Sequence, residues 1–203
     1  MKIKLGVFFD LSSVEHEVSI ITALQAIENI NKEKYDIVPI YIAKDNKMYC
    51  GDFVDDIKQY TNIDNLKRIS TQVTLSLKDN KTVLLRTNKK FYENEVYDYI
   101  DVAFPIVHGT NVEDGTLQGY LKMFNLPYVG CNVTSSAVGM DKYVSKTILK
   151  ENNIPVLDCK CYYKNEEVED IIKSVEENIE YPVIVKPINL GSSIGIVLKI
   201  EKN

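Results

Sequence analysis

A lysine followed by a loop rich in glycine and serine is the first feature of this sequence that could do chemistry. The β-branched run Pro182-Val-Ile-Val ends in Lys186, and the loop Gly191-Ser-Ser-Ile-Gly195 follows a few residues later. A lysine is rarely buried without a partner, and a phosphate held by loop N–H groups and serine hydroxyls would provide one. A hairpin with a glycine-containing turn and a lysine that extends into solvent explains the same residues. Because the lysine precedes the glycines and no helix follows, the loop is not a Walker A loop.

A second candidate segment, His108 to Gly119, directly follows an apolar run that reads as a buried strand. Ligands of open parallel sheets bind beyond the carboxyl ends of the strands, so His108 is well placed to contact one. Glu113 and Asp114 precede an expected helix, where carboxylates are favoured by the positive end of the helix dipole. For Asp114 we prefer this capping role, and for His108 we favour a functional one.

The third segment is Leu11 to Ser19, in the first expected strand-to-helix turn. Ser12 and Glu15 fit a capping box, in which Glu15 reaches back to a backbone N–H at the helix start. The functional alternative places the Glu15 carboxylate at the edge of the sheet, as a fixed negative charge for a substrate ammonium. Both histidines of the chain, His16 and His108, fall in these two strand-end segments, which supports a common cleft.

A fourth segment, Met140-Asp141-Lys142, is followed by Lys146. Lys142 could contact a phosphate from a helix or from its end. A solvated helical face explains the two lysines equally well, and without further context it is the simpler reading.

Composition limits the classes of protein to which the chain can belong. The 203 residues are 45% hydrophobic and 26% charged, with a net charge of -5. This is ordinary globular composition, and the absence of a basic run gives no support for nucleic acid or an anionic membrane as partner. No apolar run approaches the roughly 20 residues of a membrane span, and the N-terminus does not fit a signal peptide, so we expect a cytoplasmic protein. We read the four cysteines as reduced thiols rather than a metal site.

Hydrophobic spacing predicts the elements that must position these segments. Residues 2–9 read as a strand, 18–30 as a helix and 35–43 as a strand, which together suggest a βαβ unit and a parallel sheet. The remaining expected elements are a hairpin of 73–77 and 82–85, a strand at 100–107, a helix at 115–124, a strand at 126–130, a helix at 134–151, a strand at 159–163, a helix at 166–178, and a strand pair around the Gly/Ser loop. The fold class is therefore α/β, with an amino-terminal open parallel-sheet domain at 1–130 and a smaller α+β unit at 131–203.

Taken together, the four segments resemble the D-alanine–D-alanine ligases of the ATP-grasp superfamily. The family pattern runs S-x-E-[HR]-E-V-S, H-G-x-x-G-E-D-G-x-x-Q-G, M-D-K and [VI]-K-P-x-x-x-G-S-S-x-G. The chain matches it, in the same order, at Ser13 to Ser19, His108 to Gly119, Met140 to Lys142 and Val185 to Gly195. Four motifs in register are far more specific than any one of them, and they span nearly the whole chain. The resemblance implies a Rossmann-like pre-ATP-grasp domain followed by the first lobe of an ATP-grasp domain.

The resemblance also implies an activity and a role for each motif residue. Family members phosphorylate the carboxylate of one D-alanine with ATP, and the amine of a second D-alanine then displaces phosphate, in cell-wall peptidoglycan precursor synthesis. Glu15 would bind the ammonium of the first amino acid, His108 would border that subsite, and Ser192 would orient Glu15. Lys142 and Lys186 would contact ATP phosphates, with Ser193 and nearby N–H groups cradling them. Phosphoryl transfer depends mainly on positioning and charge stabilisation, which such residues supply.

Two positions depart from the family pattern. The paired glycines after the first strand are Asp10-Leu11 here, where side chains would crowd the turn and Asp10 would add a charge beside the first-substrate subsite. The glycine before Glu113 is Val112. These departures keep two alternatives open: an ATP-grasp ligase for a different amino acid, and a non-catalytic module that binds a nucleotide or an amino acid.

The family resemblance further implies a second ATP-grasp lobe that carries the Mg²⁺ ligands, and no sequence for it follows Asn203. We therefore expect a fragment that folds but is inactive alone, with ATP and Mg²⁺ as cofactors and with metal ligands beyond Asn203. None of the candidate residues above is expected to bind the metal. The expected partners are ATP and D-alanine, and the resemblance is compatible with a homodimer.

Overall fold

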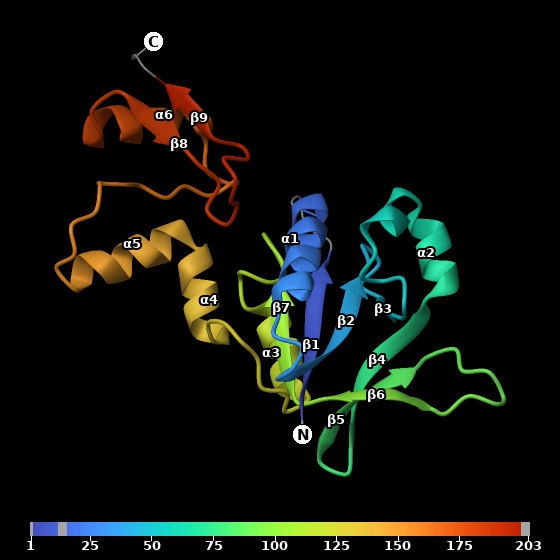
Figure 1. Cartoon of the computed structure of the whole chain (residues 1–203). Coiled ribbons are helices and arrows are strands. Elements are labelled where there is room, and N and C mark those ends of the chain that lie inside the picture. The colour runs from blue at the N-terminus through green and yellow to red at the C-terminus, as the bar shows by residue number, and fades with distance from the viewer. Residues whose placement is uncertain (1, 12–15, 200–203) are drawn as a thin grey trace. The chain divides into compact units, whose positions relative to one another are not determined.

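The computed structural model describes residues 2–11 and 16–199 of the chain (Figure 1). It divides into two compact units, residues 1–135 and 136–203.

The first unit is an α/β domain built on one seven-stranded sheet. Its elements are β1 (Ile3–Asp10), α1 (His16–Asn29), β2 (Tyr35–Ile42), β3 (Met48–Cys50), η1 (Ile57–Thr61), α2 (Ile63–Ile69), β4 (Thr71–Lys78), β5 (Lys81–Arg86), β6 (Val96–Ile100), β7 (Val102–Ile106) and α3 (Thr116–Met123). The strand order is β6-β5-β4-β3-β2-β1-β7. β1 pairs in parallel with β2 and β7, which confirms the expected βαβ unit. The other four pairings are antiparallel, and one of them is the expected hairpin, β4 with β5.

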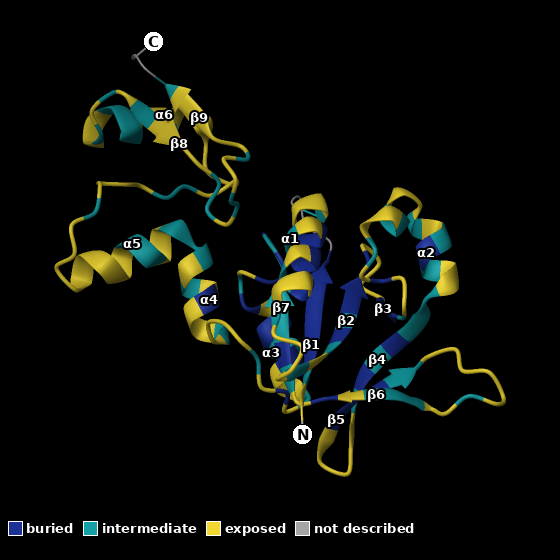
Figure 2. Cartoon of the chain, viewed as in Figure 1, coloured by how far each residue is buried: buried dark blue, intermediate teal, exposed yellow. Residues whose placement is uncertain are grey.

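Both faces of this sheet are covered, because consecutive side chains of a strand point to opposite faces. Val7 and Phe9 of β1 pack on one face with buried residues of α1 and α2, whereas Phe8 packs on the other face with Leu117 and Leu121 of α3. Most of β1, the carboxyl end of β2 and all of β3 are accordingly buried (Figure 2). The carboxyl end of β1 is thus held by two hydrophobic cores, and Leu11, the residue that follows it, belongs to one of them.

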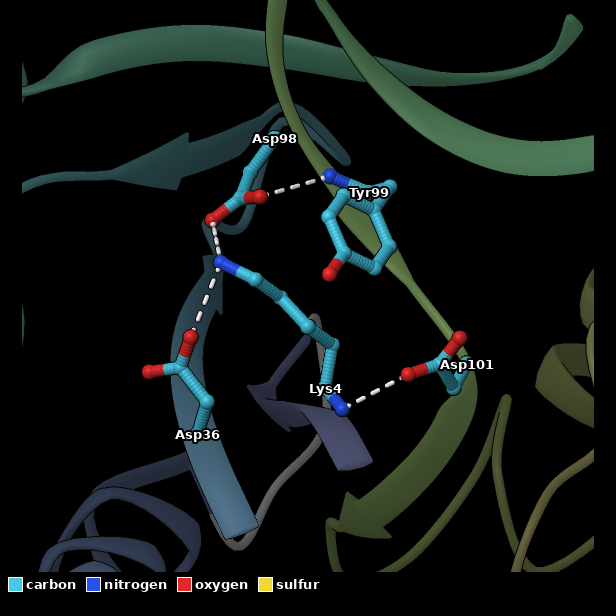
Figure 3. A network of polar contacts seen from close by, with 5 residues as sticks. All are labelled: Lys4, Asp36, Asp98, Tyr99 and Asp101. Carbon is cyan, nitrogen blue, oxygen red and sulfur yellow. Dashed lines mark hydrogen bonds and ion pairs between the residues drawn. The ribbon is translucent and has the colours of Figure 1, made fainter. Parts of the chain in front are cut away.

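A polar network fixes the opposite end of β1 (Figure 3). The Lys4 ammonium lies 3.0 Å from an oxygen of Asp36 on β2 and 2.7 Å from an oxygen of Asp98 on β6. The Lys4 backbone N–H donates to the Asp101 carboxylate, and the Asp101 N–H donates to the Lys4 carbonyl. Since Asp101 alone separates β6 from β7, this network ties β1, β2 and the β6–β7 connection together.

The second unit contains fewer elements and no buried apolar side chain among its described residues, 136–199. Its elements are most of α4 (Val133–Met140), then α5 (Lys142–Glu151), α6 (Val168–Asn178), β8 (Val183–Val185) and β9 (Val197–Lys199). β8 and β9 form the expected antiparallel pair around the Gly/Ser loop. Apolar side chains on α6, β8 and β9 remain exposed or only partly covered (Figure 2).

Three expected elements differ in the structure. The helix expected at 134–151 is two helices, because the Asp141 carboxylate accepts hydrogen bonds from the Tyr143 and Val144 N–H groups and starts a new helix. The strand expected at 126–130 is reduced to one isolated bridge, Ala103 with Tyr128. Residues 159–163 form no strand, since alternation along a segment does not supply the neighbouring strand that a ladder requires.

Candidate active site

The turn after β1 is formed by two residues in a left-handed backbone conformation. Asp10 has a φ of 71° and Leu11 a φ of 96°, and both side chains are buried. Side chains other than glycine rarely adopt this conformation, and each such residue is strained. Asp10 and Leu11 therefore adopt the backbone that the family's paired glycines would adopt freely. Glu15 and Ser12 lie outside the described residues, so the capping box and the ammonium contact stay predictions.

Asp10 contacts the first residue of α1. One carboxylate oxygen of Asp10 pairs with Nδ1 of His16. Burial raises the pKa of Asp10 to about 8, although the Tyr41 hydroxyl and the Lys44 charge work to lower it. Burial lowers the pKa of His16. Asp10 is thus a buried carboxyl group that pairs with a histidine, rather than the added charge beside a subsite that the sequence suggested.

His108 lies just beyond the carboxyl end of β7 and contacts α1. Its backbone N–H donates to the Ser19 hydroxyl at 3.0 Å, and its Nε2 lies 3.1 Å from the Thr22 hydroxyl oxygen. Because the Thr22 hydroxyl is also 2.9 Å from the Val18 carbonyl, it can donate there and accept from a protonated Nε2. The structure therefore joins two motifs that are far apart in the sequence, through Ser19 of the first and His108 of the second.

The carboxylates after His108 bind backbone N–H groups of their own loop. Glu113 accepts from Gly109 at 2.9 Å, and Asp114 accepts from Asn111 at 2.8 Å and from Thr116 at 2.9 Å. Burial works to raise the pKa of Asp114, but these N–H donors outweigh it, and the pKa is lowered overall. Asp114 thus stabilises the loop and the start of α3, as the capping alternative holds.

Lys142, at the start of α5, binds the segment that leads into the Gly/Ser loop. Its ammonium donates to the Leu190 carbonyl at 2.5 Å and to the Ile188 carbonyl at 3.1 Å, and its backbone N–H also donates to Ile188. The side chain is half-buried rather than part of a solvated helical face. Two of the three ammonium N–H groups are engaged in this way, which leaves one that could bind a phosphate.

The Gly/Ser loop makes a tight turn at its two serines. Ser192 and Ser193 have φ values of 47° and 59°, and the Ile194 N–H donates to the Gly191 carbonyl at 3.0 Å. This is the pattern of a type I′ turn, in which both central residues have positive φ. Serine is strained there, and such strain often marks ligand-binding segments. Lys186, one residue beyond β8, is exposed.

The expected convergence of Glu15, His108 and Ser192 stays a prediction, because Glu15 is not described and the other two residues belong to different units. Within residues 2–11 and 16–199 there is no group of three potential ligands that could hold a metal ion. The described chain therefore does not provide the Mg²⁺ site that the resemblance implies. None of the described helices has both the length and the apolar character needed to cross a membrane.

Sequence reasoning missed several of these contacts. Ser19 is the last residue of the first motif, so the motif itself could have indicated its role. Thr22 lies outside the motifs, and only the fold places it beside His108. The only sequence signal for the pairing of Asp10 with His16 was that position 10 is aspartate, where the family pattern has glycine. Nothing in the local sequence marks the carbonyls of Ile188 and Leu190 as partners of Lys142.

Comparison with known proteins gives one consistent result. Residues 4–131 match the family model described as D-ala D-ala ligase N-terminus, and residues 148–202 match D-ala D-ala ligase C-terminus. A D-alanine–D-alanine ligase from Thermosipho melanesiensis is 42% identical over 201 residues, which cover 98% of this chain and 53% of that protein. Among solved structures, the VanG D-Ala:D-Ser ligase from Enterococcus faecalis matches with a TM-score of 0.80 and 31% identity, over all of this chain and 57% of that one. The D-alanine–D-alanine ligase from Bacillus anthracis complexed with ATP matches with a TM-score of 0.62 and 28% identity, over 100% of this chain and 50% of that one.

The α/β domain, in which the first two motifs meet at α1, and the following lobe, in which Lys142 binds the segment before the Gly/Ser turn, fit the ATP-grasp ligase fold that the sequence motifs predicted. The family models that cover both units then decide the family. The chain belongs to the D-alanine–D-alanine ligase family, as the sequence motifs predicted. It spans about half the length of the curated relatives that it matches.

Proposed function

We propose that this chain provides two parts of an ATP-dependent ligase that joins two D-alanines for cytoplasmic synthesis of peptidoglycan precursors. Residues 1–130 would bind the first amino acid, and residues 131–203 would form the first nucleotide-binding lobe. The observation that carries the proposal is the contact of His108 with Ser19 and Thr22, because it unites the first two motifs at the carboxyl ends of parallel strands.

The proposed reaction has two steps. A carboxylate oxygen of the first D-alanine attacks the γ-phosphate of ATP, which releases ADP and leaves an acyl-phosphate. The amine of the second D-alanine then attacks the acyl carbon, and phosphate leaves as the peptide bond forms. Glu15 would hold the first ammonium, with His108 at the border of that subsite and Ser192 orienting Glu15.

The nucleotide would be held by the second unit. Lys186 is exposed and can approach a phosphate without breaking a contact within a core. Lys142 would contribute its third N–H, and Ser193 would contribute its hydroxyl and backbone. Mg²⁺ would neutralise phosphate charge, at a site that the described residues do not form.

The test is a chimera that joins residues 1–203 to the part of the Thermosipho melanesiensis ligase that the chain does not cover. We expect ADP formation that requires ATP, Mg²⁺ and D-alanine. The substitution Lys186→Ala should raise the Kd for ATP about tenfold to a hundredfold, since a hydrogen bond to a charged group contributes about 1.5–3 kcal/mol. Lys164→Ala, which removes an exposed lysine outside the motifs, is the matched control. A chimera that folds and binds ATP but never forms ADP would contradict the proposal and favour a non-catalytic binding module.

A ligase for a different amino acid is the second candidate, because Asp10 and Leu11 replace glycines beside the proposed first subsite. One structural neighbour is described as a D-Ala:D-Ser ligase. Assaying the chimera with D-serine or D-alanine in each position separates the two candidates. A homodimer is a further proposal, and the molar mass of the chain in solution tests it.

A further inference from the structure

His108 is held by two hydroxyl groups of a single helix. Ser19 and Thr22 lie three residues apart on α1, so their side chains share one face of the helix, and α1 runs beside β7 (Figure 1). The Ser19 hydroxyl accepts from the His108 backbone N–H at 3.0 Å, whereas the Thr22 hydroxyl oxygen lies 3.1 Å from Nε2 of the His108 ring. Ser19 therefore fixes the backbone at His108, and Thr22 contacts the imidazole itself.

The Thr22 hydroxyl has a single proton, and the helix backbone binds it. The hydroxyl oxygen lies 2.9 Å from the Val18 carbonyl oxygen and 3.2 Å from the Ser19 carbonyl oxygen. Because carbonyl oxygens only accept hydrogen bonds, the hydroxyl donates to them and accepts from Nε2 of His108. In a neutral imidazole one nitrogen carries the proton and the other is an acceptor. The contacts of Thr22 thus place the proton on Nε2 and make Nδ1 the acceptor.

An imidazole in this state suits a ligand that donates hydrogen bonds. The His108 side chain is partly exposed, and no group among residues 2–11 and 16–199 forms a hydrogen bond with its Nδ1. The residue follows the carboxyl end of β7, where ligands of parallel strands bind. An ammonium group has only N–H donors, so an unprotonated Nδ1 complements it, whereas a protonated Nδ1 would oppose it.

We propose that Thr22 is a positioning residue that holds His108 as the Nε2-protonated tautomer and so presents Nδ1 to the ammonium of the first amino acid. The inference rests on the proposed function, because that function places His108 at the border of the first subsite. Thr22 itself is assigned no contact with substrate. It acts through the ring, since the hydrogen bond at one nitrogen of a histidine decides the state of the other.

The tautomer is measured in the chain alone by ¹⁵N NMR of the histidine side chains. At about pH 8.5 ordinary histidines are neutral, and ¹⁵N shifts distinguish protonated from unprotonated ring nitrogens. His108→Asn identifies the His108 signals by removing them. We expect the proton of His108 on Nε2 in the wild type. In Thr22→Val its exchange with water should become about twofold to tenfold faster, because one neutral hydrogen bond is lost.

The matched control for this measurement is Thr147→Val. The Thr147 hydroxyl also donates to the carbonyl four residues before it in a helix, that of Tyr143 at 2.9 Å, but it belongs to α5 of the other unit. The substitution makes the same change of side chain and should leave the His108 signals unchanged. A proton on Nδ1 in the wild type would overturn the inference, and so would the same Nε2 shift and exchange rate in Thr22→Val as in the wild type.

Positioning is tested by the KM for the first D-alanine in the chimera. Thr22→Val should raise this KM about twofold to tenfold, while kcat and the KM for ATP stay unchanged, because a contact to the bound amino acid is weakened. Thr22→Ser keeps the hydroxyl group and should restore the KM, and Thr147→Val should not alter it. A purely structural role of Thr22 would instead reduce the amount of folded enzyme, which lowers kcat and leaves the KM unchanged.

The outcomes separate this inference from the proposed function. An active chimera in which Thr22→Val leaves the KM for the first D-alanine unchanged would overturn positioning but not the ligase activity. An inactive wild-type chimera would overturn the proposed function and with it the contact of Nδ1 with substrate, while the NMR spectra of the chain still decide the tautomer. If Thr22→Val does not fold, Thr22→Ala takes its place with the same expectation of rescue by serine.

Discussion

At the residue scale, the two ends of β1 carry charged groups that are compensated very differently. Lys4, near the start of the strand, has two carboxylates within 3.0 Å and a tyrosine ring beside it. Asp10, at the other end, contacts His16, and the Tyr41 hydroxyl and the Lys44 charge also act on its carboxyl group. A partly buried charge whose partners are all in place, such as Lys4, is typical of a structural network. The Asp10 oxygens lack a hydrogen bond of full geometry among the described residues, and Asp10 lies beside the first motif, where chemistry is proposed. The Lys4 network therefore stabilises the fold and has no part in the site.

Lys4→Met is expected to lower the free energy of unfolding by about 1–3 kcal/mol at neutral pH, because it leaves Asp98 without its main partner. Burial works to lower the pKa of Lys4, but Asp98 and Asp36 outweigh it and raise the pKa above 10.5. The contribution is thus complete below pH 10.5 and is lost as the pH rises through the raised pKa.

Urea unfolding of Lys4→Met at pH 7 and at pH 11 measures both effects. The deficit relative to wild type should shrink at the higher pH. Lys47→Met, which removes an exposed pair with Asp45, should change stability by less than about 0.5 kcal/mol. A Lys4→Met protein as stable as wild type at pH 7 would show that the network contributes nothing.

At the element scale, short loops determine where the functional side chains point. The loop between β7 and α3 is held by Glu113 and Asp114, and Gly115, the residue immediately before α3, has a φ of 91°. The loop between β8 and β9 is held by Lys142 from α5. In both cases a residue of the family motif stabilises the loop itself, so that a motif position does not by itself identify a substrate contact.

Gly115→Ala is expected to destabilise the protein by about 1–3 kcal/mol, because alanine at positive φ is strained. A Cβ there would also meet the Val133 carbonyl oxygen at 2.7 Å. Gly119→Ala, in the same helix with nothing within 4 Å of its Cβ, should instead stabilise by about 0.5–1 kcal/mol. Chemical denaturation measures the free energy of unfolding of both variants. Equal changes in the two would show that the backbone at Gly115 can relax.

Lys142→Met is expected to loosen the segment before the Gly/Ser turn, because the ammonium no longer binds the carbonyls of Ile188 and Leu190. Amide hydrogen exchange of residues 188–194 should become about tenfold faster without nucleotide. Lys146→Met is the matched control, since Lys146 lies on the same helix but donates to Leu157. If amide exchange is unchanged in Lys142→Met, backbone contacts alone hold the turn.

At the scale of the whole molecule, apolar burial is unevenly distributed. The first unit has two hydrophobic cores, one on each face of its sheet. No apolar side chain is buried in the described part of the second unit, which ends at residue 199. Stability measured on this chain should therefore depend mainly on the first unit.

A single type of substitution in each unit tests this distribution. Ile40→Ala, in β2 and 0% exposed, should cost about 2–5 kcal/mol of stability because it leaves a cavity. Ile172→Ala, in α6 and 51% exposed, should change stability by less than about 0.5 kcal/mol. Comparable losses for the two variants, measured by denaturant unfolding, would show that α6 contributes to a core after all.

The sequence by itself determined the elements and motifs whose signals are local. The apolar run in residues 2–9 predicted β1, because a strand covered on both faces is apolar along its length. Helical spacing in 18–30 predicted α1, because burial on one face of a helix imposes a period on the sequence. The four motifs predicted the family before any fold was known, since they report the chemistry of a ligand. Even the break between α4 and α5 had a local cause, the side chain of Asp141.

Only the tertiary structure decided which distant groups meet. It made four of the six pairings in the seven-stranded sheet antiparallel, placed Thr22 beside His108, and gave Lys142 the carbonyls of Ile188 and Leu190. It also buried Asp10 against His16, although the sequence suggested an added charge beside the subsite. These outcomes depend on long-range packing, which brings together residues whose contact cannot be predicted from the sequence around either of them. The raised pKa of Asp10 follows from the same packing, because burial is its largest cause.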